Sequence, residues 1–284
     1  MVLPTFPDDD TPAEEILDHM EKRFTKRQEF DKATKWFDIK MPNDKATGLA
    51  VVGDPHLGAN GCNVALLRRD VALMKDTPGI LPVNIGDTVD NWGSRLVHLY
   101  SENDVSRQTE RRLARWFLES LPWCVWLMGN HDMMTMEFAT YLQAINARQV
   151  PMLDWEAKFQ LVFPGGVTCR ISAAHNFKGT SYLNPLHGQK RNATWHGAEM
   201  ADIHVSGHHH IGAVSQEETE DGRIITLGRA RGYKFIDSFA KVHGYADKQY
   251  GSTILFVIDP SAEILVQPFM DLAEGCRYLS YLRA

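Results

Sequence analysis

The amino-acid sequence predicts a layered α/β domain whose sheets are mixed rather than purely parallel. Two observations carry this prediction. Short apolar runs alternate with amphipathic stretches along most of the chain, and the later runs follow one another without long helices between them. A chain of 284 residues is long enough to bury a sizeable core. Because runs without intervening helices pair as hairpins or at mixed orientation, we expect antiparallel or mixed pairing in the second half.

The expected elements follow from this alternation. Eight apolar runs are expected to be strands, at residues 48–53, 81–85, 124–128, 167–174, 203–206, 223–227, 253–258 and 263–267. Amphipathic stretches predict helices at 63–75, 105–120 and 133–146. A further helix is expected from residue 11 to about residue 37, because Thr11 can cap it, Pro12 suits its first turn and Glu14 completes a capping box. We expect this helix to pack on the main domain.

Composition narrows the class of protein. The formal net charge of -6 argues against a protein that coats nucleic acid through a global positive field, although a local basic surface remains compatible with it. The start, MVLPTFPDDD, lacks the basic and apolar regions of a signal peptide, and no long apolar run follows, so we expect a cytoplasmic protein with no membrane contact. The four cysteines are far apart, which indicates reduced thiols.

Five of the apolar runs end in polar residues that an apolar core would reject. These ends read Asp54-Pro55-His56, GDTVD at 86–90, GNHD at 129–132, His175-Asn176 and GHHH at 207–210. Ligands bind where the ends of strands converge in α/β sheets, so we expect the five ends to face one site. Carboxylates and imidazoles that meet without enough Lys or Arg repel one another, and a metal ion resolves this because it accepts both kinds of ligand.

The spacing of these polar residues fits metal binding. Residues two apart in an extended segment point the same way, so Asp54 and His56 can hold one ion together, and His208 and His210 would also point the same way if the strand geometry persists to the turn. Asp87 could serve two ions and hold them roughly 3.5 to 4 Å apart, the separation used for in-line displacement at phosphorus. Two divalent ions and two carboxylates leave a charge of about +2, which favours an anionic substrate such as a phosphate.

Taken together, the motifs resemble those of the calcineurin-like metallophosphoesterase family. They appear in the order D-x-H, G-D-x-x-D, G-N-H-[DE], a later His and G-H-x-H, and they run from Asp54 to His210, more than half of the chain. The resemblance implies a four-layer α/β/β/α sandwich of two mixed sheets flanked by helices, with a dinuclear metal site at the strand ends. It divides the chain into an N-terminal helical extension, 1–45, and a catalytic domain, 46–284.

The same resemblance implies a role for each motif residue. One ion would be held by Asp54, His56, Asp87 and His210, and the other by Asp87, Asn130, His175 and His208. His131 would be the general acid that protonates the leaving oxygen while a metal-held hydroxide attacks in line, and Asp90 would orient and charge this histidine. The mixed nitrogen and oxygen ligands suit Mn, Fe, Zn, Co or Ni, and we favour Mn because it commonly serves the diesterase branch of the family.

Several histidines and one aspartate have alternative interpretations. His175 follows a strand without any fuller motif, so His187 and His196 compete with it as a ligand. Asp132 is expected to be structural. His204 lies out of phase with the apolar residues beside it, which indicates a histidine at the surface or in the second layer whose ring nitrogens have hydrogen-bond partners and do not bind metal. Alternation turns His209 away from both ions, and it should tolerate replacement by Thr or Glu.

Two basic segments follow or adjoin the metal motifs. They combine cations with an aromatic ring, which suits phosphate contact and base stacking as well as ordinary loop solvation. The candidate substrate contacts are Lys190, Arg191, Arg229, Arg231 and Tyr233. Trp92 is either an aromatic lip of the pocket or simply packed.

Departures from the branches of the family favour a phosphodiesterase that acts on nucleic acid or nucleotides. Asn91 stands where its protein phosphatases carry Arg, and His131 stands where its lipid-precursor pyrophosphatases usually carry Arg. Few residues follow His210, so a nuclease would be a compact one. The alternative is a phosphomonoesterase acting on a nucleotide, a small phosphate or a phosphoprotein, and a minor alternative is a noncatalytic scaffold that keeps the fold.

Overall fold

The strands that precede the first three motifs lie together in one six-stranded sheet. The computed structural model describes residues 8–33, 36–179, 181, 183–195, 200–235 and 252–284. Strand order in this sheet is β12-β11-β2-β3-β4-β5, with β2 to β5 parallel and β11 and β12 antiparallel to their neighbours. The strands are β2 (Thr47–Val52), β3 (Ile80–Asn84), β4 (Val125–Met128), β5 (Met152–Asp154), β11 (Ile254–Ile258) and β12 (Val266–Phe269).

The strands that precede the last two motifs lie in a second six-stranded sheet. Its order is β1-β6-β7-β8-β10-β9, in which β7, β8 and β10 are parallel to one another while β6 and β9 run antiparallel to β7 and β10. The strands are β1 (Phe37–Lys40), β6 (Glu156–Val162), β7 (Thr168–Ala174), β8 (Ile203–Ser206), β9 (Ala213–Glu218) and β10 (Ile224–Arg229). Both sheets are therefore mixed, as the sequence predicts.

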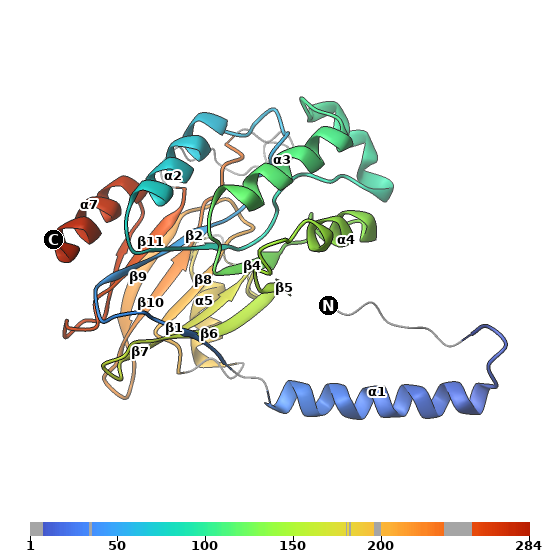
Figure 1. Ribbon diagram of the computed structural model, residues 1–284, viewed down its shortest axis with the longest axis horizontal. Coiled ribbons are helices and arrows are strands. Elements are labelled where there is room, and N and C mark those ends of the chain that lie inside the picture. Colours follow the sequence, from blue (N-terminus) through green and yellow to red (C-terminus); the bar gives the residue numbers. More distant parts are fainter. Residues whose placement is uncertain (1–7, 34–35, 180, 182, 196–199, 236–251) are drawn as a thin grey trace.

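Helices cover the outer face of each sheet (Figure 1). The first sheet packs against α2 (Val64–Asp76), α3 (Arg107–Ser120), α4 (Met136–Ala144) and α7 (Leu272–Arg283), while α5 (His187–Thr194) lies on the second. A 3-10 helix, η1 (Ser94–Glu102), precedes α3. One apolar core fills the space between the first sheet and its helices, another the space between the sheets, and a small one the space under α5. The four-layer α/β/β/α sandwich predicted from the sequence is confirmed.

The N-terminal segment differs from its prediction in two ways. Helix α1 (Ala13–Ala33) stands apart from both sheets, and Leu17, Met20 and Phe24 on it are more than half exposed (Figure 1). The expected packing of this helix on the main domain is therefore not seen. Strand β1 pairs in parallel with β6, although we placed its residues in the extension 1–45. Residues 37–40 therefore form part of the second sheet.

None of the helices in the described ranges is both long and apolar enough to span a membrane.

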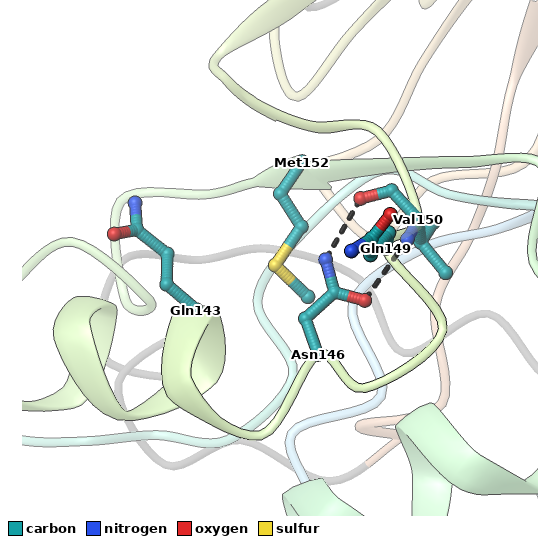
Figure 2. A pocket seen from close by; sticks show the side chains of 5 residues that line it. All are labelled: Gln143, Asn146, Gln149, Val150 and Met152. Carbon is teal, nitrogen blue, oxygen red and sulfur yellow. Dashed lines mark hydrogen bonds between the residues drawn. The ribbon is translucent and has the colours of Figure 1, made fainter. Parts of the chain in front are cut away.

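A pocket of about 340 Å³ opens beside the turn that follows α4 (Figure 2). Asn146 holds this turn, because its side chain accepts from the Val150 N–H at 3.0 Å and donates to the Val150 carbonyl at 2.8 Å. The pocket is lined by Gln143, Asn146, Gln149, Val150 and Met152. Since none of these side chains is ionisable, the pocket offers no acid, base or nucleophile.

Tyr233 is a core residue rather than a surface for base stacking. Its ring is fully buried, and its hydroxyl lies 2.7 Å from Asp70 Oδ2 and 2.6 Å from Thr253 Oγ1. Asp70 is itself buried and also accepts from Ser252 Oγ at 2.7 Å. The segment after β10 is thereby fixed to α2 by a buried polar network, and the prediction that Tyr233 contacts substrate is wrong.

We expect Tyr233→Phe to lower the free energy of unfolding by about 1 to 3 kcal/mol, because buried Asp70 loses a donor and the buried Thr253 hydroxyl loses its acceptor. Urea unfolding followed by circular dichroism measures this. Tyr281→Phe is the matched control, since Tyr281 is 78% exposed. Equal stability of the two variants would contradict the structural role.

Candidate metal centre

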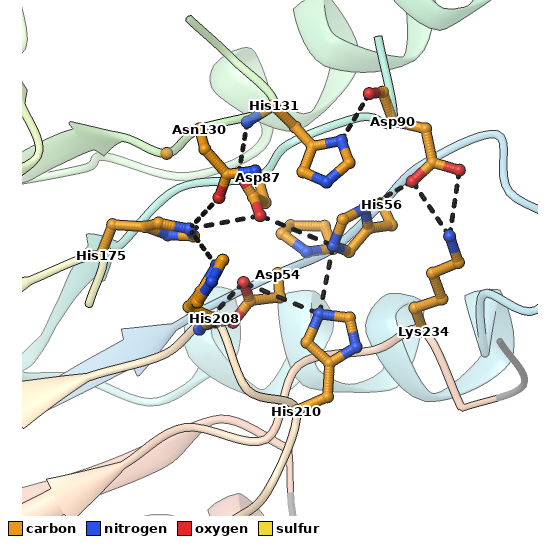
Figure 3. A network of polar contacts seen from close by, with 12 residues as sticks. Asp54, His56, Asp87, Asp90, Asn130, His131, His175, His208, His210 and Lys234 are labelled. Atoms are coloured by element: carbon orange, nitrogen blue, oxygen red, sulfur yellow. Dashed lines mark hydrogen bonds and ion pairs between the residues drawn. The ribbon is translucent and has the colours of Figure 1, made fainter. Parts of the chain in front are cut away.

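The carboxyl ends of strands from both sheets meet at one place, and the predicted motifs lie there (Figure 3). Asp54, Asp87 and Asn130 follow the parallel strands β2, β3 and β4 of the first sheet. His175 and His208 follow β7 and β8, which are parallel neighbours in the second sheet. Residues separated by more than 150 positions are thus neighbours, because the two sheets face each other and end at the same edge.

The backbone at these residues is left-handed and not extended. The φ angles are 50° at Asp54, 43° at His56, 56° at Asp87, 69° at His208 and 50° at His210. The expectation that the residues of each pair point the same way because the strand continues is therefore wrong, and tight turns bring them together instead. Left-handed backbone at a residue with a Cβ costs on the order of 1 kcal/mol or more, and such strain gathers at functional sites.

Asp54, His56 and His210 form the first group of donors. The Nε2 atoms of His56 and His210 are 3.2 Å apart, and His210 Nε2 lies 3.9 Å from Asp54 Oδ1. The three side chains each offer one donor atom within 4.8 Å of the others. Gly207 permits this approach, because a Cβ there would meet the Asp54 carboxylate.

Asp87, Asn130, His175 and His208 form the second group. His175 Nε2 lies 2.9 Å from Asn130 Oδ1, 3.0 Å from His208 Nδ1 and 3.3 Å from Asp87 Oδ2. Asp87 Oδ2 is also 3.8 Å from His56 Nε2, so this carboxylate lies between the two groups. Its place matches that of a bridging ligand.

Hydrogen bonds at the far side of two imidazoles fix which nitrogen faces the centre. His175 Nδ1 lies 2.9 Å from the carbonyl oxygen of Ile85, and His56 Nδ1 lies 2.6 Å from Asp90 Oδ1. Both partners accept, so Nδ1 carries a proton and Nε2 is the nitrogen that faces the centre. Each Nε2 then faces other acceptors at close range. A cation between them removes this conflict, and the residues present therefore fit divalent metal ions.

The electrostatics of the chain alone point the same way. Burial and the nearby carboxylates raise the pKa of Asp54 to about 8, despite the opposing effect of His175. Burial lowers the pKa of His175, yet Asp87 and Asp54 outweigh it and raise that pKa to about 10. Buried carboxylates and a proton-seeking imidazole indicate a centre that lacks positive charge, which metal ions supply.

Asp90 anchors two histidines through two different groups. Its carboxylate contacts His56 Nδ1, whereas its main-chain carbonyl lies 2.6 Å from His131 Nδ1. We expected the carboxylate to orient His131, and this is corrected: the backbone of Asp90 orients it. Lys234 Nζ lies 3.2 Å from Asp90 Oδ2 and balances the buried charge. Lys234 is a site residue that the sequence did not predict, although it belongs to the basic segment 229–234.

Asp132 joins two motif loops and is not a member of either group of metal donors. Its carboxylate accepts from the backbone N–H groups of Asp87 at 2.8 Å, Thr88 at 3.0 Å and Gly129 at 3.0 Å. It is fully buried. The expected structural role of Asp132 agrees with these contacts.

The competing histidines lie away from the donor groups. His187 begins α5 and belongs to neither group, and His196 lies outside the described residues. His204 is buried beneath α5, where its Nδ1 meets Asn192 Nδ2 at 2.9 Å. His209 is absent from the donor groups, and its ring packs edge-on against His208.

The other basic candidates fall into two classes. Lys190 pairs with Glu217 across a half-exposed surface, and Arg191 lies over the Trp195 ring. Arg229 and Arg231 are both more than nine-tenths buried, and the Arg231 guanidinium lies 3.5 Å from the centre of the Phe235 ring. Arg229 is the last residue of β10, the strand that ends beside the centre, and Arg231 follows it by two residues.

Comparison with known proteins gives distant structural likenesses and no sequence match. No protein-family model matches the chain. A search of curated proteins finds no match either. Among solved structures, the NAD nucleotidase NadN of Haemophilus influenzae is 11% identical with a TM-score of 0.42, and the alignment covers 79% of this chain and 49% of that one. The chain thus spans about half the length of that protein.

Two further solved structures resemble the chain at the same distance. The calcineurin-like phosphoesterase YfkN of Bacillus subtilis is 12% identical with a TM-score of 0.37, covering 84% of this chain and 99% of that one. Nuclease MPE of Pseudomonas putida is 14% identical with a TM-score of 0.37, covering 78% and 87%. At these values the likenesses carry no argument about activity. The fold rests on the two mixed sheets and their helical layers, and the centre rests on its own residues.

Proposed function

We propose that the chain is a dinuclear metal-dependent phosphoester hydrolase. The observation that carries the proposal is the meeting of two groups of nitrogen and oxygen donors that share Asp87. One ion would be held by Asp54, His56, Asp87 and His210, and the other by Asp87, Asn130, His175 and His208. Divalent ions bound there would supply positive charge to a phosphoryl group and lower the pKa of a coordinated water. Mn is our favoured metal.

His131 is the proposed general acid. Its backbone N–H donates to Asp87 Oδ1 at 2.9 Å, which fixes the start of the side chain at the edge of the centre. Its Nδ1–H donates to the Asp90 carbonyl, so Nε2 remains to carry the proton for a leaving oxygen. The rings of His56 and Trp92 pack against it at 4.9 Å and 4.6 Å between centroids, which holds the imidazole in one orientation.

Asp90 and Lys234 are proposed as positioning residues. Asp90 holds the tautomer of His56 and the direction of His131 at once, through its carboxylate and its carbonyl. Lys234 keeps that carboxylate charged, and His56, Lys234 and His131 all act to hold the pKa of Asp90 far below its usual value despite its burial. Losing Asp90 would therefore disturb a ligand and the acid together.

A phosphodiesterase acting on nucleic acid or nucleotides is the favoured activity. Asn91 supports it against a protein phosphatase, because its side chain donates to the His131 carbonyl at 2.8 Å and accepts from Thr135 Oγ1 at 3.1 Å. This position is a loop anchor here, whereas protein phosphatases carry an Arg there. The alternative, a phosphomonoesterase acting on a nucleotide or small phosphate, shares the same centre and differs in the number of ester groups it accepts.

The ester preference is tested with two aryl substrates and added Mn. We expect hydrolysis of a bis-aryl phosphate well above that of the mono-aryl phosphate, followed by cleavage of linear single- or double-stranded DNA or RNA. The reverse order would establish the phosphomonoesterase. Activity on neither substrate with Mn, Fe, Zn, Co or Ni would overturn the hydrolase.

His131→Asn should lower kcat by about 100-fold or more, because general acid catalysis contributes roughly 10² to 10⁴. The variant should retain bound metal, which inductively coupled plasma mass spectrometry measures. The loss should shrink for esters whose leaving group has a low pKa, since such groups need no proton. A uniform loss across leaving groups would assign His131 a role other than the acid.

The triplet His208-His209-His210 offers a matched test of the ligands. We expect His208→Ala and His210→Ala each to lower metal stoichiometry or weaken metal binding at least tenfold, while His209→Thr keeps both ions. Isothermal titration with Mn gives the affinities, and circular dichroism controls for folding. Loss of an ion from His209→Thr would show that the ligand assignment is out of register.

A further inference from the structure

Arg229 is a buried cation without a partner among the described residues. It closes β10 and is only 4% exposed. Its Nε and Nη2 are buried without a hydrogen-bond partner, and Arg229 forms no ion pair with a carboxylate of the described residues, although the charge of Asp54 acts on it. Lys234, five residues later, contrasts with it, because Lys234 is paired with Asp90.

The register of the second sheet places Arg229 beside the metal centre. Its Cα is opposite that of Ser206 on β8, and the motif turn starts at the next residue, Gly207. Gln189 of α5 donates to Ser206 Oγ at 2.8 Å and to the Gly228 carbonyl at 3.1 Å, so α5 covers this end of both strands. Besides burial, the charge of Arg229 lowers the pKa of His209. The charge of Asp54 raises the pKa of Arg229, against the larger effect of burial. Arg229 therefore flanks the turn that carries His208 and His210.

An unpaired guanidinium in this place is unfavourable for the chain alone. Removing a charge from water costs several kcal/mol unless a counter-charge or hydrogen bonds replace the lost hydration. Burial lowers the pKa of Arg229 to about 10, so the group is still charged at neutral pH. The planar fork of an arginine matches two oxygens of a phosphate, and a phosphate supplies both the missing charge and the missing acceptors.

We propose that Arg229 binds a phosphate of the substrate, alongside the metal centre. The identity of the ligand as a substrate phosphate rests on the proposed function. The position of the subsite rests on the burial of Arg229 and on the missing hydrogen-bond partners of its Nε and Nη2. The phosphate is either the group being transferred or the next phosphate of a polynucleotide or dinucleotide. The His209 ring contacts the His208 ring, and the charge of Arg229 acts on His209, so His209 is near the proposed subsite.

The first experiment uses the full-length protein without metal, in EDTA and a phosphate-free buffer. Thermal unfolding is followed with and without inorganic phosphate and pyrophosphate. If the anion is present at about ten times its Kd for the site, it should raise the Tm of the wild type by about 2 to 4 °C. Arg229→Met should lose this rise, and Arg112→Gln, which removes an exposed positive charge on α3, should keep it. No rise in the wild type, or an equal rise in Arg229→Met, would overturn the proposal.

The same variant separates a ligand contact from a structural one. Without anion, Arg229→Met should unfold at the wild-type temperature or above it, because it removes a buried charge that has no hydrogen-bond partner at Nε or Nη2 and only the effect of Asp54 to offset its burial. A Tm lower than wild type by several degrees would mean that the guanidinium stabilises the fold itself, and the proposal would fail. Arg229→Lys keeps the positive charge but lacks the two parallel N–H donors of the guanidinium. It should therefore show part of the anion-induced rise in Tm that Arg229→Met loses.

His209→Glu tests the place of the subsite from the neighbouring side. A carboxylate at this position would neutralise Arg229 and exclude an anion, so the rise in Tm with phosphate should disappear while Mn binding persists. His209→Thr is its control and should keep both. If His209→Glu binds phosphate as wild type does, the two side chains do not share a site and the proposal is wrong.

Activity with Mn then identifies which phosphate Arg229 holds. The ratio of kcat/KM between wild type and Arg229→Gln is compared for a dinucleotide with and without a 5′-terminal phosphate. A loss that is at least tenfold greater with the extra phosphate assigns the neighbouring group, and an equal loss assigns the transferred group. No loss for either substrate would overturn the proposal. A protein that shows the phosphate-dependent rise in Tm but no hydrolysis would instead refute the proposed function and leave the subsite intact.

Discussion

The convergence of hydrogen-bond acceptors on one point is the constraint on which the rest of the site depends. With Nδ1 of His175 committed to the Ile85 carbonyl, its Nε2 faces an amide oxygen, a carboxylate oxygen and another imidazole at about hydrogen-bond distance. No arrangement of the neutral side chains alone satisfies all of them. The chain holds this unfavourable grouping in place with strained backbone at its motif residues and with Asp132, which ties the loops of Asp87 and Gly129 together.

The supports of the site divide between side chains and main chain. Backbone carbonyls fix His175 and His131, whereas a carboxylate fixes His56. A carbonyl cannot change its charge, so the two histidines it holds keep their direction whatever happens to nearby ions. Asp90 links both modes in one residue, which explains why a buried lysine is placed beside it.

The sequence predicts the features that depend on local interactions and misses those that depend on contacts between distant residues. The strands with continuous apolar runs were predicted within a few residues, because their pattern reflects burial on both faces. Strands β1, β5, β6 and β9 were not predicted, because each is short or alternates between more and less exposed residues and so lacks a continuous apolar run. The motif residues were predicted from type and order, but their left-handed backbone was not, and neither was the partner of Asp90. Those depend on contacts across 34 or more positions, such as His56 with Asp90 and Lys234 with Asp90.

Arg229 at the end of β10 and Lys234 shortly after it show why burial alone does not reveal a role. Lys234 and Arg229 are similarly buried, at 6% and 4% exposure. Lys234 meets a carboxylate and lies over the Trp92 ring, so its burial is compensated within the fold. Arg229 has no ion pair among the described residues, and its Nε and Nη2 are buried without hydrogen-bond partners. A guanidinium buried in this way, on the strand that ends beside the proposed metal centre, is explained by a ligand that brings negative charge and acceptors.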